Sequence, residues 1–173
     1  MAKGLTRSLG RGDALERIAP FNLNIPIRDL EVAITEDTSG WGTAVLDALP
    51  EGNVLFLGAV LYLDSMERGD ENLAATFDGD FSLGSTATAN TTLSGDNVDL
   101  IASTSTETAV GGVSSENRGA SGTAVKVIDN TGGDKALNLN VLTDAGDTTD
   151  NSSLTVNGSL HVAYIMLGSD DIE

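Results

Sequence analysis

The sequence predicts an all-β protein, a β-sandwich of jelly-roll type with an extended N-terminal arm. About eight to ten short segments have the alternating apolar pattern or the β-branched content of strands. Segments rich in Gly, Asp, Asn and Ser separate them at intervals of roughly eight to fifteen residues. Only residues 14–19 have a helical pattern. The 173 residues suffice for one such domain, which we place at residues 29–173 after an arm at residues 1–28.

Charge is divided unevenly between these two parts. The formal net charge is −17, but residues 1–28 carry five cations against two acids and are net positive by 3. Residues 29–173 carry four cations against twenty-four acids, a net charge of −20. A body with this much negative charge repels nucleic acids and anionic membranes, and we expect neither as a partner.

The arm begins with Gly, Ser, Thr and cations around two isolated leucines, which cannot build a core of their own. Asp13 and Glu16 form a weak capping-box variant that opens "ALERIA", and Pro20 ends this short helical turn. The arm is either a solvated tail or a segment that becomes ordered on an acidic partner. We favour the second hypothesis because a solvated tail does not need its apolar residues, Leu5, Leu9, Leu15, Ile18 and Phe21.

The first strand of the body is predicted in "FNLNIPI", where apolar residues alternate with Asn and Pro. Pro26 lacks an amide proton, so this strand belongs at the edge of a sheet. The apolar residues change parity around Arg28 and Asp29, which predicts a bend or bulge. A turn at "EDTSG", a short strand at "WGTAVL" and a tight turn at "LPEG" follow.

The run "NVLFLGAVLYLD" predicts a central strand covered on both faces, because both parities are apolar. Its apolar part, Val54 to Leu63, is about half the ~20 residues that a membrane helix needs, so we do not expect it to span a membrane. "SMERGDEN" is predicted as a polar loop. "DGDFSLGSTATANTTL" is predicted as a turn and a Thr-rich strand or pair of strands.

The C-terminal half predicts further strands in "NVDLIAST", "TAVKVID" and "ALNLNVLT", with turn-rich connections at "VGGVSSENRGASG", "NTGGD" and "DAGDTTDN". Asn138 and Asn140 are expected on an exposed face, opposite Leu139 and its apolar neighbours. In "SLTVNGSLHVAYIML" the apolar residues keep one parity across Gly158, which favours one long strand kinked there. A hairpin turning at Asn157-Gly158 is the alternative.

The residues contain no recognisable catalytic pattern, and we expect no enzyme activity, cofactor or metal. There is no cysteine, and the single histidine, His161, has no triad or zinc frame around it. Two aspartate-rich turns, "DGD" and "DAGDTTDN", could offer oxygen ligands to Ca²⁺ but lack EF-hand spacing, and we favour turn closure by their side chains. Trp41 is expected to pack in the core, with an interface anchor as the alternative.

Three stretches resemble small structural proteins of tailed bacteriophages, in particular capsid decoration (cement) proteins with a jelly-roll-like body. They are "VAITEDTSGWGTAVLDALPEGNVLFLGAVLYLD", "FSLGSTATANTTLSGDNVDLIAST" and "GSLHVAYIML", within residues 30–167. The resemblance implies a virion protein on the outer capsid surface that stabilises the shell by bridging major capsid subunits, as a homotrimer. A head-fibre, tail-associated or receptor- or glycan-binding module is the alternative, followed by a non-viral carbohydrate-binding or adhesive sandwich.

The resemblance also implies that the arm lies along the capsid. Mapped onto this sequence, the capsid-contacting residues are Lys3, Leu5, Arg7, Leu9, Arg11, Arg17 and Phe21. Trp41 is a possible further anchor, and the expected partners are the major capsid protein and other copies of the chain.

Overall fold

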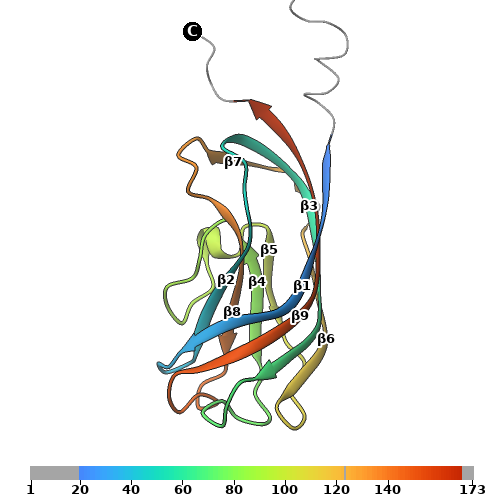
Figure 1. The fold of residues 1–173 in the computed structure, drawn as a ribbon. Coiled ribbons are helices and arrows are strands. Elements are labelled where there is room, and N and C mark those ends of the chain that lie inside the picture. The colour runs from blue at the N-terminus through green and yellow to red at the C-terminus, as the bar shows by residue number, and fades with distance from the viewer. Residues whose placement is uncertain (1–19, 123, 169–173) are drawn as a thin grey trace, which may run out of the picture.

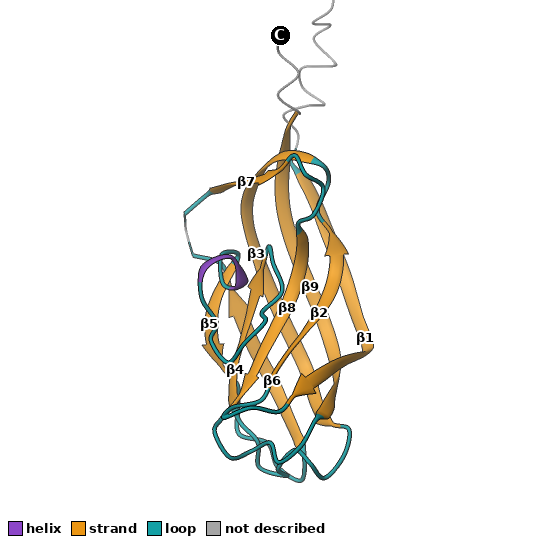
Figure 2. Cartoon of the chain, turned by 90° about the vertical axis from the view of Figure 1, so that its left-hand side faces the viewer, coloured by secondary structure: helices purple, strands orange, loops and turns teal. Residues whose placement is uncertain are grey.

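The computed structural model describes residues 20–122 and 124–168, and this part of the chain folds into nine antiparallel strands (Figures 1 and 2). One short 3-10 helix, η1 (Gly95–Asn97), accompanies them, and no helix in the described residues is long and apolar enough to cross a membrane. The predicted turn at "ALERIA" lies outside the described residues. The strands are β1 (Phe21–Thr35), β2 (Trp41–Ala48), β3 (Gly52–Arg68), β4 (Gly79–Gly84), β5 (Ile101–Ser105), β6 (Val113–Ala120), β7 (Lys126–Asn130), β8 (Ala136–Thr143) and β9 (Ser152–Gly168).

The strand order is that of a jelly roll, which confirms the predicted fold class. Neighbouring strands follow the path β5-β4-β8-β2-β1-β9-β3-β6, and β7 is an additional strand that pairs with β3. The path folds over at the short β1–β2 pairing, so that one sheet is β1-β9-β3-β6 and the other is β2-β8-β4-β5. The far edges also approach each other, because Gly119 of β6 lies against Phe81 and Ile101.

The hydrophobic core lies between the two sheets and is built from both. Each buried aliphatic side chain contributes roughly 1.5–3 kcal/mol relative to an exposed one. In β9 the buried residues keep even parity on both sides of Gly158, and the strand is continuous, so the long-strand prediction is confirmed and the hairpin is excluded. The core includes Val32, Ile34, Leu61, Leu63, Phe81, Leu83, Leu139, Val141, Leu154, Val156, Leu160 and Val162.

Strand β1 has the edge position and the bulge that its sequence predicts. It pairs with β2 only at Ile34 and Thr35, so the half that contains Pro26 is hydrogen-bonded to β9 alone. The register with β9 shifts between Ile27 and Leu30, and Asp29 takes a left-handed φ of 47° there. The Asp29 amide donates to Asn157 Oδ1 at 2.8 Å. Because residues 21–28 belong to this strand, the sheet begins at Phe21, within the range assigned to the arm.

The prediction that β3 is covered on both faces is wrong. Only one face is buried, whereas Leu57 and Tyr62 on the other face are 37% and 36% exposed. Both parities contain buried residues because register shifts between Phe56 and Gly58 and between Leu63 and Ser65 exchange the inward positions. The strand also continues to Arg68, through half of the predicted loop "SMERGDEN".

Two further differences concern β6 and β8. β6 forms within the predicted connection "VGGVSSENRGASG", because its polar and small residues pair with β3. In β8 the expected exposed face is covered, and Asn138 and Asn140 are buried. The covering segment, residues 85–100, crosses this face, and the Asn140 amide group donates to the carbonyl oxygens of Asn97 (2.9 Å) and Thr86 (3.2 Å). The covering segment, which is remote in sequence from β8, therefore buries the two asparagines that the local alternating pattern predicts to be exposed.

Candidate interaction surfaces

The loops at one end of the body are strongly acidic. The strands β1 and β9 bring Pro20, the first described residue, and Leu167 to one end, which we call the arm end (Figure 1). Four loops form the opposite end: residues 36–40, 69–78, 106–112 and 144–151. They contain no Lys or Arg but nine acids, Glu36, Asp37, Asp70, Glu71, Asp78, Glu107, Asp144, Asp147 and Asp150. We call this the acidic end.

Aspartate side chains of the acidic end both close turns and join loops. Asp70 Oδ1 accepts the Asn72 amide within its own turn at 2.9 Å, whereas Asp78 and Asp147 form contacts between loops. The Asp78 amide donates to Asp147 Oδ2 at 3.0 Å, and the Thr108 hydroxyl donates to Asp78 Oδ2 at 3.1 Å. The pKa of Asp144 is raised above its ordinary value. The main cause is partial desolvation of its carboxyl group, and the second is repulsion by the negative charges of Asp78, Asp147 and Asp80. Within the described residues, no three Asp, Glu or His side chains are grouped so that they could hold a metal ion.

Replacing Asp144 with Asn is expected to raise the melting temperature at pH 7 by about 1–2 °C, because it removes one of several repelling charges from a screened surface. The folded-state pKa lies above the unfolded one, so the folded protein takes up the proton first as the pH falls. The cost of the Asp144 charge therefore disappears as the pH falls through the raised pKa, and the gain from Asp144→Asn shrinks with it. Thermal unfolding between pH 7 and pH 3 measures this difference.

The matched control is Asp134→Asn, which removes the same charge from an exposed turn at the arm end. An equal gain in both variants would show that the net charge of the protein, and not the cluster around Asp144, is responsible.

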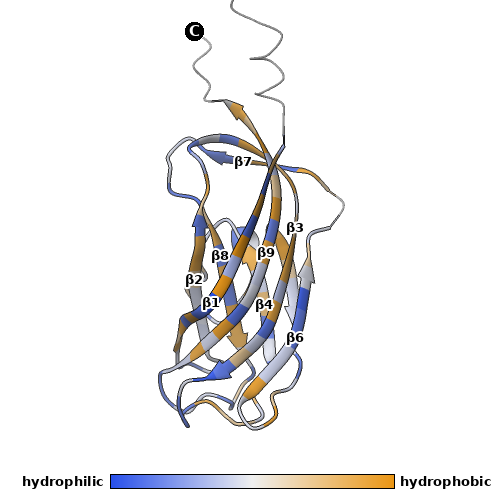
Figure 3. Ribbon diagram, turned by 45° about the vertical axis from the view of Figure 1, so that its right-hand side comes forward, coloured by the Kyte–Doolittle hydropathy of each residue, from blue (hydrophilic) through white to orange (hydrophobic). Residues whose placement is uncertain are grey.

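Apolar side chains gather at the arm end. Leu55 pairs with both Ile165 and Val127, and all three lie on the outward side of their strands. Val127 is 54% exposed and Leu167 is 52% exposed. Figure 3 shows apolar colour at this end of β9. We call this surface the arm-end patch, and it consists of Leu55, Leu57, Val125, Val127, Ile165 and Leu167. An apolar surface of this kind, next to a chain end, is typical of an interaction site.

Only two of the residues predicted to contact a partner lie in the described part of the chain. Phe21 begins β1, is 46% exposed and stacks on Tyr164 with ring centroids 5.4 Å apart. Trp41 begins β2 near the acidic end, where it pairs with Leu142, and is half-buried rather than part of the main core. Lys3, Leu5, Arg7, Leu9, Arg11 and Arg17 lie outside the described residues.

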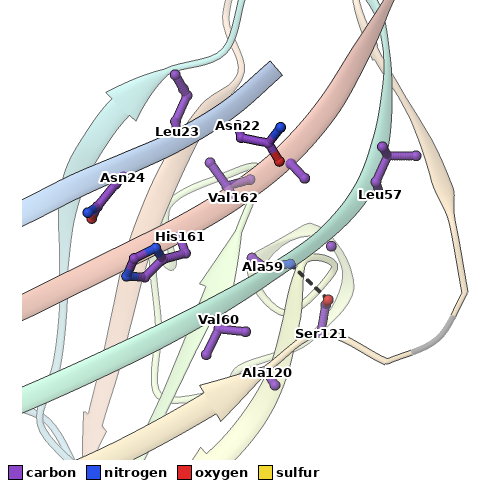
Figure 4. Close-up of a pocket in the computed structure, with 12 residues that line it drawn as sticks. Asn22, Leu23, Asn24, Leu57, Ala59, Val60, Ala120, Ser121, His161 and Val162 are labelled. Carbon is purple, nitrogen blue, oxygen red and sulfur yellow. Dashed lines mark hydrogen bonds between the residues drawn. The ribbon is translucent and has the colours of Figure 1, made fainter. Parts of the chain in front are cut away.

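A groove of about 470 Å³ crosses the outward face of the sheet β1-β9-β3-β6 (Figure 4). Its lining includes Asn22 and Asn24 of β1 and His161 of β9. Next to it, the His161 ring meets the Tyr62 ring edge-on at 6.1 Å, and the Arg118 guanidinium lies 5.5 Å from the centre of the Tyr62 ring. Register explains this cluster, because Val60 pairs with His161 while Tyr62, two residues further along β3, pairs with Arg118.

A second cleft, of about 340 Å³, has its charges already paired. Lys126 Nζ lies 2.8 Å from Asp99 Oδ2, and Lys135 Nζ lies 3.1 Å from Asp96 Oδ2. Asp99 also accepts hydrogen bonds from the amide and the hydroxyl of Ser85. These contacts attach the covering segment to β7 and to the turn after it, which is a structural role.

Sequence reasoning missed the arm-end patch and the Arg118 cluster. The patch combines residues from β3, β7 and β9 that are remote in sequence, and "NVLFLGAVLYLD" alone suggests a covered strand. The available signal was the odd-parity apolar set at the end of β9, Ile165 and Leu167, which faces away from the buried even positions. Searches of protein families, of curated proteins and of solved structures find no match to this chain.

Proposed function

We propose that the protein is a virion structural protein that decorates the outside of a bacteriophage capsid and stabilises it by bridging major capsid subunits, as a homotrimer. The observation that carries the proposal is the difference between the two ends of the body. The apolar arm-end patch lies at one end, and nine acidic residues lie in the loops of the other. The apolar end is suited to attachment, and the acidic end is suited to contact with solvent.

Each end has a physical role under this proposal. At the arm end, Lys3, Arg7, Arg11 and Arg17 would complement an acidic shell, while the apolar patch supplies contact area that excludes water. At the acidic end, like charge would keep neighbouring particles apart in solution. The jelly-roll fold is compatible with the proposal but does not by itself favour it, because the same fold serves many unrelated functions.

Binding to DNA-filled capsids that lack the protein tests the proposal. Deleting residues 2–20 removes four cations, and replacing Val127 with Asp places a charge in the arm-end patch. We expect each change to weaken capsid binding by at least about tenfold, because a buried unpaired charge or a lost charged arm costs more than 1.4 kcal/mol. Co-sedimentation measures the binding, and native mass spectrometry of the free protein measures the trimer.

The matched control is Val110→Asp, which introduces the same charge at a valine that is 84% exposed at the acidic end. It should leave capsid binding unchanged. Unchanged binding of the deletion variant would show that the arm does not contact the shell. Binding to host cells without any affinity for capsids would favour the alternative, a head-fibre, tail-associated or receptor-binding module.

A further inference from the structure

The groove on the outward sheet face presents hydrogen-bonding groups that the protein itself does not use. The side chains of Asn22, Asn24 and His161 make no hydrogen bond to any described residue, whereas most described asparagines close turns or hold loops. The small residues Gly58, Ala120 and Ala163 lie between them and leave a depression in the surface. Figure 4 shows Asn22, Asn24, His161 and Ala120 on the neighbouring strands β1, β9 and β6 that line this groove together with β3.

Arg118 adds a positive charge without an acidic partner. It is exposed, and among the described residues it forms no ion pair, whereas Lys126 and Lys135 are both paired. The cation–π contact with Tyr62 positions the guanidinium, and its N–H groups form no hydrogen bond to a described side chain or backbone group. A guanidinium presented in this way binds a carboxylate with two parallel hydrogen bonds.

We propose that this groove binds an acidic saccharide, with neutral sugar hydroxyls on the amides and imidazole of the groove and a sugar carboxylate on Arg118. Tyr62 and Arg118 lie two residues along their strands from Val60 and Ala120, a distance of about 7 Å, which is within the reach of a short oligosaccharide. A single cation can pair with one carboxylate, whereas a nucleic acid needs several cations along its phosphate backbone.

The location of the groove favours a sugar over an extended acidic peptide. Peptides that bind to sheets usually pair their backbone with a free strand edge. Here the groove lies on a sheet face, where β9 is hydrogen-bonded to β1 on one side and to β3 on the other. The groups available to a ligand are therefore side-chain amides, an imidazole, a hydroxyl and a guanidinium, which suit ring hydroxyls and a carboxylate.

Titration calorimetry of the full chain with a tetrasaccharide of three neutral sugars and one uronic acid, at about 0.15 M salt, tests the site. The methyl ester of the same tetrasaccharide is the uncharged probe. Arg118→Gln is expected to weaken binding of the acid by about tenfold or more and to leave binding of the ester nearly unchanged, because only the acid offers a carboxylate. Ala163→Leu, which fills the groove, is expected to abolish binding of both.

Arg28→Gln is the matched control, since Arg28 is exposed on β1 outside this groove and the substitution changes the net charge equally. Equal weakening by Arg28→Gln and Arg118→Gln would overturn the proposal in favour of general electrostatics. Absence of binding of both probes at millimolar concentration would overturn it as well. Tighter binding of a tetraglutamate peptide, with the same dependence on Arg118, would assign the site to an acidic peptide instead. Arg118 lies outside the arm-end patch, so failure of this test leaves capsid attachment to its own experiment.

Discussion

Gly158→Ala is expected to lower the free energy of unfolding by about 3 kcal/mol or more, because the added methyl group has no space. A Cβ at position 158 would overlap the carbonyl oxygen of Tyr62 in the neighbouring strand β3. That oxygen belongs to the backbone of a paired strand and cannot rotate away, so β9 or β3 must move. Thermal unfolding followed by circular dichroism should show a melting temperature lower by about 6–12 °C.

The control for this experiment is Gly122→Ala, since nothing lies within 4 Å of the Cβ that it would add. In unstrained positions Gly→Ala usually stabilises a protein by roughly 0.4–1 kcal/mol, through the unfolded chain. The two substitutions should therefore change stability in opposite directions. A stable Gly158→Ala variant would mean that β3 and β9 approach less closely at this point than described.

Asn140→Asp is expected to have an effect of similar size, about 3 kcal/mol, because it places a charge in a buried and fully satisfied network. Asn140 Oδ1 accepts from the Thr43 hydroxyl (2.9 Å) and the Thr88 amide (2.8 Å). The amide nitrogen of Asn140 donates to two carbonyl oxygens, which a carboxylate would repel. Hydrogen exchange should show faster opening of the covering segment, residues 85–100, than of the core strands.

The matched control is Asn90→Asp in the same covering segment. Asn90 is exposed and uses Oδ1 to accept the Thr92 amide, which an aspartate does equally well. We expect its stability to change by less than about 0.5 kcal/mol. If Asn140→Asp unfolded the protein without any preference for residues 85–100, the network would support the whole sandwich rather than hold this layer.

The features of the fold that could be predicted depend on short-range signals. The parity change at Arg28 and Asp29 predicts the bulge of β1, and the constant parity across Gly158 predicts a continuous β9. Both signals lie within one strand and need no knowledge of its neighbours. The jelly-roll class follows in the same way from the number of strands, their spacing and the lack of helix.

The features that could not be predicted depend on partners remote in sequence. Asn140 sits in an alternating pattern typical of a half-exposed strand, and only the return of residues 85–100 across β8 buries it. β6 has a glycine and a left-handed Glu116 (φ 60°), both unfavourable in an isolated strand, and it forms because β3 offers a free edge. The Arg118–Tyr62–His161 cluster depends on strand register, which local periodicity does not define.

The free edge of β1 has a consequence for solubility. An exposed strand edge is a template on which a second molecule can add a strand, and crowded copies of a protein increase that risk. In β1 this edge carries Pro26, which has no amide hydrogen to offer, and the bulge at Asp29 interrupts the ladder two residues after Ile27. Copies of the protein held at high local density can therefore lie side by side without joining their sheets into an aggregate.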